Sequence, residues 1–141
     1  MTQEQALKIL KTGANVFLTG EPGSGKTHTV NSFVSYLRAQ KIEPTITAST
    51  GIAATHISGM TIHSWTGIGI KNFLDKYELD RITSSEYLVK RINKSKILII
   101  DEISMLRPDV LDAINWTLIK NGCKRLHEIQ IIFIGDLKQL P

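Results

Sequence analysis

The sequence lacks the features that mark secreted, membrane and repeat proteins. Its single cysteine, Cys123, cannot form a disulfide within the chain, which is the usage expected in a reducing compartment. No apolar run approaches the roughly 20 residues of a membrane-spanning helix. The N-terminus MTQEQALKIL also lacks the basic-then-apolar order of a signal peptide. We therefore expect no membrane partner and an intracellular protein, in the cytoplasm or nucleoid if bacterial or viral, and in the nucleus or mitochondrion if eukaryotic.

The chain has 141 residues, of which 42% are hydrophobic, 21% charged and 6% aromatic. This length and composition predict one domain with its own core. The net charge of +4 permits a polyanionic partner but does not require one. The densest basic stretch is KRINKSK, residues 90–96, with four cations and no acid. It is typical of a solvated helix end before a strand, and a contact for a polyanion is the alternative.

Apolar runs alternate with helical patterns along the chain. NVFLTG, PTITAS, KILIIDE and EIQIIFIGD read as buried strands, of which KILIIDE is continuously apolar, as in a strand covered on both faces. The first two strands flank a helix with Val30, Phe33, Val34 and Leu37 on one face. Residues 107–122 have a helical pattern that begins near Pro108 and ends near a glycine. This alternation predicts an α/β fold with a parallel sheet flanked by helices on both faces.

The remaining segments are more polar. Residues 2–12 read as a short N-terminal helix, and residues 51–70 as short helical pieces and turns. The roughly 25 residues that follow are expected to be helical, with a capping box at Thr83 and Glu86.

The stretch GEPGSGKT matches G-x-x-x-x-G-K-[ST] at every defined position, between a strand and a helix. Its glycines allow successive backbone N–H groups to face phosphates. Lys26 is expected to contact the β- and γ-phosphates, and the Thr27 hydroxyl to bind Mg²⁺. The sequence therefore predicts a site for ATP with Mg²⁺. The predicted nucleotide-binding residues of this stretch are Gly20, Glu21, Pro22, Gly23, Ser24, Gly25, Lys26, Thr27 and His28.

Two acids end the strand ILIIDE, at the edge of a parallel sheet where ligands bind. Asp101 is expected to hold Mg²⁺ and Glu102 to polarise the attacking water, because hydrolysis needs a group that orients and deprotonates water. The last strand is followed by GDLKQLP at the same edge of the sheet. There Gln139 is a candidate sensor of the γ-phosphate, since an amide both donates and accepts. Asp136 is a candidate to orient that loop or a water.

Three stretches together resemble one family. TASTGIAATHISGMTIHSW (47–65), IIDEISML (99–106) and GDLKQLP (135–141) resemble motifs Ia, II and III of superfamily-1B DNA helicases, closest to the Pif-type and RecD-like branch. With the phosphate loop, the resemblance runs from the N-terminus to the last residue. It implies a single RecA-like domain of the P-loop NTPase class over residues 1–141, 5′-to-3′ unwinding coupled to ATP hydrolysis, and work in DNA repair, recombination and telomere maintenance.

The resemblance assigns two further features. Gln5 would be the Q-motif glutamine that reads adenine, with Gln3 as the residue in an alternative register. Gln5 has a competing local interpretation, because Thr2 and Gln5 also form an S/T-x-x-Q capping box. In the family, the motif III strand lies between the phosphate-loop strand and the strand that carries Asp101.

The block at 47–65 suits a single-stranded DNA backbone. Ser49, Thr50 and Gly51 stand at a predicted helix start, with hydroxyls and an N–H for phosphates. Thr61 and His63 add donors further along. Trp65 is a base-stacking candidate or a core anchor, while His56 is interpreted as structural. The predicted DNA contacts are Ser49, Thr50, Gly51, Thr61 and His63.

Family enzymes have a second motor domain whose arginines reach the γ-phosphate, and no arginine of this chain lies in a matching motif. We therefore expect the chain to be truncated before that domain, to bind ATP, and to be weak or inactive alone. The alternatives are a P-loop ATPase or kinase acting on something other than DNA, and an ATP-gated nucleic-acid-binding module that is not itself a helicase. Oligomeric state is not predicted.

Overall fold

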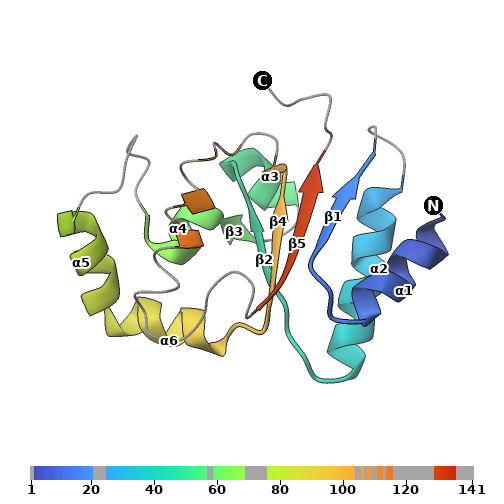
Figure 1. Cartoon of the computed structure of the whole chain (residues 1–141), viewed down its shortest axis with the longest axis horizontal. Coiled ribbons are helices and arrows are strands. Elements are labelled where there is room, and N and C mark those ends of the chain that lie inside the picture. The colour runs from blue at the N-terminus through green and yellow to red at the C-terminus, as the bar shows by residue number, and fades with distance from the viewer. Residues whose placement is uncertain are drawn as a thin grey trace.

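The computed structural model describes residues 2–20, 25–56, 59–68, 76–103, 106, 108, 111–112, 114–115 and 129–135. Eleven elements are bounded within them (Figure 1): α1 (Gln3–Lys11), β1 (Val16–Thr19), α2 (Lys26–Ala39), β2 (Thr45–Ala48), α3 (Gly51–His56), β3 (Met60–Thr61), α4 (Ile62–Thr66), α5 (Lys76–Ser84), α6 (Glu86–Lys94), β4 (Ile97–Asp101) and β5 (Gln130–Gly135). Among the described residues, no helix is long and apolar enough to cross a membrane.

The five strands form one parallel sheet in the order β1-β5-β4-β2-β3. The predicted α/β fold is therefore confirmed, as is the expected place of β5 between the phosphate-loop strand and the strand of Asp101. The start of β5 is fixed by hydrogen bonds to the α1–β1 connection. The Gln130 amide donates to the carbonyls of Leu10 (2.9 Å) and Ala14 (3.0 Å), and the Ile131 N–H donates to the Asn15 side chain (2.8 Å).

Both faces of the sheet are covered, as the apolar run KILIIDE predicted. Ile97 and Ile99 of β4 pack in a core with Leu10 of α1 and with Phe33 and Leu37 of α2. The alternate β4 residues, Leu98 and Ile100, pack on the other face with buried residues of α4, α5 and α6. Figure 1 shows α1 and α2 on one side of the sheet and these three helices on the other. The core is thus two layers of isoleucine- and leucine-rich contacts around the central strands.

Some local expectations are corrected. The capping box at Thr83 and Glu86 is wrong, because Thr83 lies inside α5. The boundary between α5 and α6 falls at Ser85, whose hydroxyl caps α6 by accepting a hydrogen bond from the Leu88 N–H. Trp65 is only 2% exposed and belongs to the core around α4, so it is an anchor and not a base-stacking surface. From the helical pattern at 107–122, Leu111 and Ile114 pack on the same core. Cys123 lies outside the described residues.

Candidate functional site

The parallel sheet brings three predicted motifs to one edge. β1 leads into the phosphate loop, β4 ends at Asp101, and β5 ends at Gly135, just before Asp136. The strand register brings these ends to within one residue of each other, since Thr19 pairs with Gly135 and Ile100, just before Asp101, pairs with Phe133. Figure 1 shows the arrowheads of the long strands pointing to this edge. The carboxyl edge of the sheet is therefore the candidate site, as expected for an open parallel sheet.

The described ends of the phosphate loop are held together around Lys26. Gly25 has φ +92°, a left-handed conformation that favours glycine, and it caps α2 without a side-chain hydrogen bond. The Lys26 Nζ donates to the Gly20 carbonyl, which joins the two ends of the loop. Thr27 and His28 follow in the first turn of α2 and are exposed. The start of a 14-residue helix offers unpaired N–H groups and a positive dipole end to phosphate. Glu21, Pro22, Gly23 and Ser24 lie outside the described residues.

The two N-terminal glutamines have different roles. Gln5 completes the capping box of α1: its Oε1 accepts from the Thr2 N–H (2.9 Å) and its own N–H donates to the Thr2 hydroxyl (3.1 Å). This is the local alternative foreseen for Gln5. The Gln3 amide instead lies against Gly25, in the space that a side chain at Gly25 would fill. The Gln3 amide therefore lies beside the phosphate loop, while the Gln5 cap uses Oε1 and leaves the amide Nε2 as a donor.

The acid pair forms a tight, unusual turn at the end of β4. The Glu102 N–H donates to Asp101 Oδ1 at 2.8 Å. Glu102 has φ +56°, in the left-handed region that residues other than glycine rarely adopt. Both acids are half-buried. Strained backbone of this kind is concentrated at functional sites, where surrounding contacts hold it.

Ser49 supplies those surrounding contacts. Its N–H donates to the Asp101 carbonyl at 3.1 Å, and its hydroxyl donates to the Glu102 carbonyl at 2.6 Å. A serine has one hydroxyl proton, so this donor is already used and is not available to a DNA phosphate. The predicted DNA contact at Ser49 is therefore better described as a brace between the 47–65 block and the acid pair. Sequence reasoning missed this role, because nothing in the spacing links residue 49 to residue 102.

The other predicted DNA residues lie beyond Ser49 on α3 and α4. The Thr50 hydroxyl accepts from the Ala53 N–H (3.2 Å) and the Thr61 hydroxyl from the Ser64 N–H (3.1 Å), so each caps a short helix and keeps its own proton as a donor. Open space surrounds Gly51, since a side chain there would meet nothing within 4 Å. His63 is half-buried in α4. These four residues remain candidates for backbone contacts.

Two parts of the predicted site are not tested by these contacts. Gln139 and Asp136 lie outside the described residues. For the metal, Thr27 and Asp101 offer oxygen atoms at the same edge, which are the ligands that Mg²⁺ takes. No cluster of three or more histidine, cysteine or acidic residues occurs among the residues that the structure describes.

A phosphate loop between β1 and α2, with an acid pair two strands away on a parallel sheet, defines a P-loop nucleotide-binding protein. The family follows from comparison with known proteins. Residues 2–141 match the model of the PIF1-like helicases, and the chain belongs to this family.

Individual relatives agree. The chain is 50% identical over 143 residues to the ATP-dependent DNA helicase Pif1 of Psychrobacter sp. (strain PRwf-1), covering 100% of this chain and 22% of that protein. The crystal structure of Pif1 helicase from Candida albicans superimposes with a TM-score of 0.85 at 33% identity, covering 99% of this chain and 32% of that one. Pif1 helicase from Bacteroides in complex with ADP-AlF3 and ssDNA gives a TM-score of 0.77 at 37% identity, covering 99% and 32%. The chain thus spans about a fifth of the length of the curated relatives it matches.

Proposed function

We propose that the chain is the ATP-binding half of a 5′-to-3′ DNA helicase motor, which couples binding and hydrolysis of Mg-ATP to movement on single-stranded DNA. The observation that carries the proposal is the Ser49 brace. It joins the candidate catalytic acid Glu102 to the start of α3, where the DNA candidates Thr50 and Gly51 lie. A shift of α3 on DNA would therefore act directly on the turn that carries Glu102.

Within this proposal each nucleotide contact has a definite role. Lys26 neutralises the β- and γ-phosphates, and the N-terminus of α2 receives the phosphate chain. Thr27 and Asp101 hold Mg²⁺, which when bound neutralises phosphate charge. Gln5 hydrogen-bonds the adenine through its amide Nε2, since the helix cap uses only its Oε1, and Gln3 is the alternative because its amide lies against Gly25.

Glu102 orients and deprotonates the attacking water, with Gln139 reporting the γ-phosphate to the DNA surface. The carboxylate of Glu102 suits this because it is half-buried at the carboxyl edge and its backbone is fixed by Ser49. A relative solved with both ADP-AlF3 and ssDNA supports a site where the two ligands act together.

The proposal also includes a second motor domain in the full-length protein. In enzymes where an arginine reaches the γ-phosphate, that arginine accelerates hydrolysis by roughly 10³–10⁵. With arginines supplied from outside these 141 residues, the chain alone should bind Mg-ATP and turn it over slowly. Unwinding would require the longer protein.

The test is ATP binding and hydrolysis by the 141-residue chain, with and without oligo-dT, for the wild type, Lys26→Ala and Glu102→Gln. We expect binding in the wild type and in Glu102→Gln, loss of binding in Lys26→Ala, and no more than slow turnover in any of the three. Strong DNA-stimulated turnover that is lost in Glu102→Gln would refute the half-motor, since the chain would then complete its own site. Equal ATP affinity in Lys26→Ala and wild type would refute the assignment of the loop before α2 as the phosphate-binding site.

A further inference from the structure

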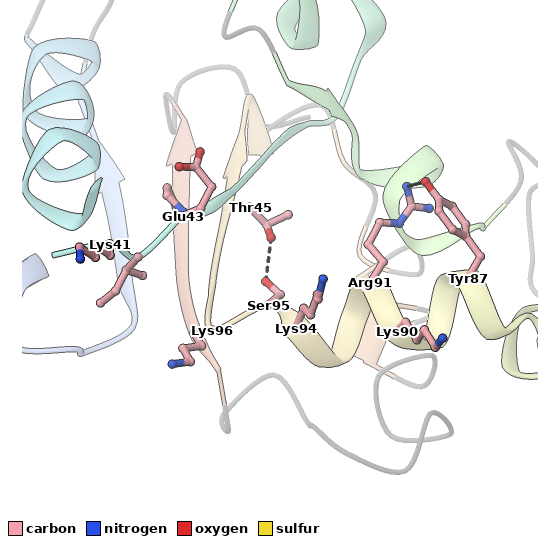
Figure 2. A pocket seen from close by; sticks show the side chains of 11 residues that line it. Lys41, Glu43, Thr45, Tyr87, Lys90, Arg91, Lys94, Ser95 and Lys96 are labelled. Atoms are coloured by element: carbon pink, nitrogen blue, oxygen red, sulfur yellow. Dashed lines mark hydrogen bonds between the residues drawn. The ribbon is translucent and has the colours of Figure 1, made fainter. Parts of the chain in front are cut away.

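A basic groove of about 630 Å³ lies at the edge of the sheet opposite the nucleotide site (Figure 2). It runs between the α2–β2 connection and the last turns of α6. Thr45 at the start of β2 and Lys96 just before β4 line it, so it sits where the parallel strands begin. The length of β2, Thr45 to Ala48, separates the two edges by about 10 Å at a rise of ~3.3 Å per residue.

The charge in this groove is almost entirely positive. The cations that line it are Lys41, Lys90, Arg91, Lys94 and Lys96. The one lining acid, Glu43, is held by Arg38, whose guanidinium contacts both carboxylate oxygens at 2.8–3.2 Å. These hydrogen bonds from Arg38 lower the pKa of Glu43, so its charge is already matched by a residue outside the lining. Among the described residues, no carboxylate pairs with the four lysines.

The ends of the helices account for only part of this cluster of positive charges. Lys94 lies in the last turn of α6, where a cation interacts favourably with the helix dipole. Lys41 directly follows the C-cap of α2, where the helix dipole also favours a cation, but its backbone conformation is costly. It has φ +64° at the end of α2, where its N–H donates to the Arg38 carbonyl and the Ile42 N–H donates to the Leu37 carbonyl. This is the glycine position of a Schellman motif, and a lysine there costs stability.

An exposed aromatic ring stands at one end of the groove. Tyr87 is 70% exposed, and the Arg91 guanidinium lies 4.7 Å from its ring centroid. Arg91 also donates to the Ser64 carbonyl at 3.1 Å, which ties the groove to α4 and the adjoining His63. Figure 2 shows Tyr87 and Arg91 together at that end, with the lysines along the rest. Lysines beside an exposed ring are the combination that binds single-stranded nucleic acid, with phosphates on the cations and a base on the ring.

We infer that this groove binds a single-stranded nucleic acid, with its phosphates on Lys41, Lys90, Lys94 and Lys96 and a base stacked on Tyr87. It is a second contact, separate from Thr50 and Gly51 at the carboxyl edge. The Arg91–Ser64 contact ties the groove to α4, which carries the candidate His63. The inference does not depend on ATP binding or hydrolysis.

The test is fluorescence anisotropy of labelled (dT)20 with the 141-residue chain at several salt concentrations. Lys90→Gln/Lys94→Gln removes two exposed groove charges. Lys8→Gln/Lys11→Gln removes two exposed charges from α1 and is the matched control. With ~0.7 counterions released per single-strand phosphate contact, the groove variant should lower the salt slope by about 1.4 and the affinity at 50 mM salt roughly tenfold or more. The control should match the wild type.

Two tyrosines separate stacking from charge. Tyr87→Leu should weaken binding about fivefold or more, the low end for loss of one base–aromatic stack. Tyr77→Leu is the control, because Tyr77 is 86% exposed on α5 and does not line the groove. A 5-iododeoxyuridine oligonucleotide should photo-crosslink to Tyr87.

Lys41→Gly gives an independent check, because it removes a positive charge from the groove and also removes the cost of a left-handed backbone at a residue with a side chain. We expect a more stable protein that binds (dT)20 more weakly. The inference is overturned if Lys90→Gln/Lys94→Gln binds like its control, if Lys41→Gly keeps full affinity, or if the wild type does not bind at 50 mM salt. Tighter binding of a 20-base-pair duplex, indifferent to Tyr87→Leu, would overturn the single-stranded assignment.

Thr50→Val distinguishes this inference from the proposed function. Loss of binding in Thr50→Val alone, with the groove variants unchanged, would overturn the groove and leave the carboxyl-edge interface. Loss in the groove variants alone would support the groove and count against the DNA contacts of the proposed function.

Discussion

Replacement of Glu102 by glycine should stabilise the protein while it removes the candidate catalytic acid. Glu102 has φ +56°, and left-handed backbone costs a residue other than glycine roughly 1–2 kcal/mol. Glycine relieves that cost but gives the unfolded chain more freedom, which offsets about 0.4–1 kcal/mol. The net gain over alanine at this position should therefore be about 0.5–1 kcal/mol.

Glu102→Ala is the necessary control, because it removes the carboxylate and keeps the backbone cost. The difference between Glu102→Gly and Glu102→Ala then reports the backbone alone. For a chain of 141 residues the gain corresponds to a Tm higher by roughly 1–4 °C, measured by thermal unfolding and checked by urea denaturation. If the glycine variant is no more stable than the alanine variant, the turn is not strained and the role given to Ser49 as its brace fails.

Two further predictions concern stability away from the acid pair. Gly67 has φ +80°, and a side chain there would lie 2.5 Å from Leu88 Cδ1, whereas Gly13 has φ +86° and open space around it. In urea denaturation, Gly13→Ala should therefore lower the free energy of unfolding by about 1 kcal/mol, and Gly67→Ala by about 1–3 kcal/mol more. Equal losses of stability would mean that α4 and α6 are not packed as described. The Glu43 pKa is lowered by hydrogen bonds from Arg38, so the pair adds stability that is present above the ordinary carboxyl value of 4.5 and is lost as the pH falls through the lower folded value. Glu43→Gln should remove this part of the acid dependence in a series of Tm against pH at low salt, and an unchanged profile would show that the pair does not form in solution.

The fold was predictable because apolar runs of strand length alternate with helical patterns. The run KILIIDE indicated a strand covered on both faces, and β4 packs two cores with alternate residues. The phosphate loop and acid pair were predictable for a related reason, since parallel strands deliver their carboxyl ends to one edge.

Side-chain roles within the motifs were less predictable. From the sequence alone, either Gln3 or Gln5 could be the glutamine of the N-terminal motif. Because α1 begins at Gln3, Gln5 falls at the position that completes the helix cap, and the Gln3 amide lies against Gly25. The hydroxyl of Ser49 was assigned to DNA, but long-range pairing of β2 with β4 places it at the Glu102 carbonyl. The left-handed lysine at residue 41 leaves no sequence signal at all, because glycine is the residue that normally marks such a turn.

The position of β5 has a consequence for how the protein is made. β1 pairs with β5 and with no other described strand, so Val16 has no partner in the sheet until Ile132 has been synthesised. At translation rates of ~5–20 residues per second, this delay is on the order of ten seconds. During that time the nascent chain exposes an unpaired strand directly before its phosphate loop. The phosphate loop is thus synthesised well before β5, the strand that holds β1 in the sheet, so the nucleotide site can be assembled only after β5 has been made.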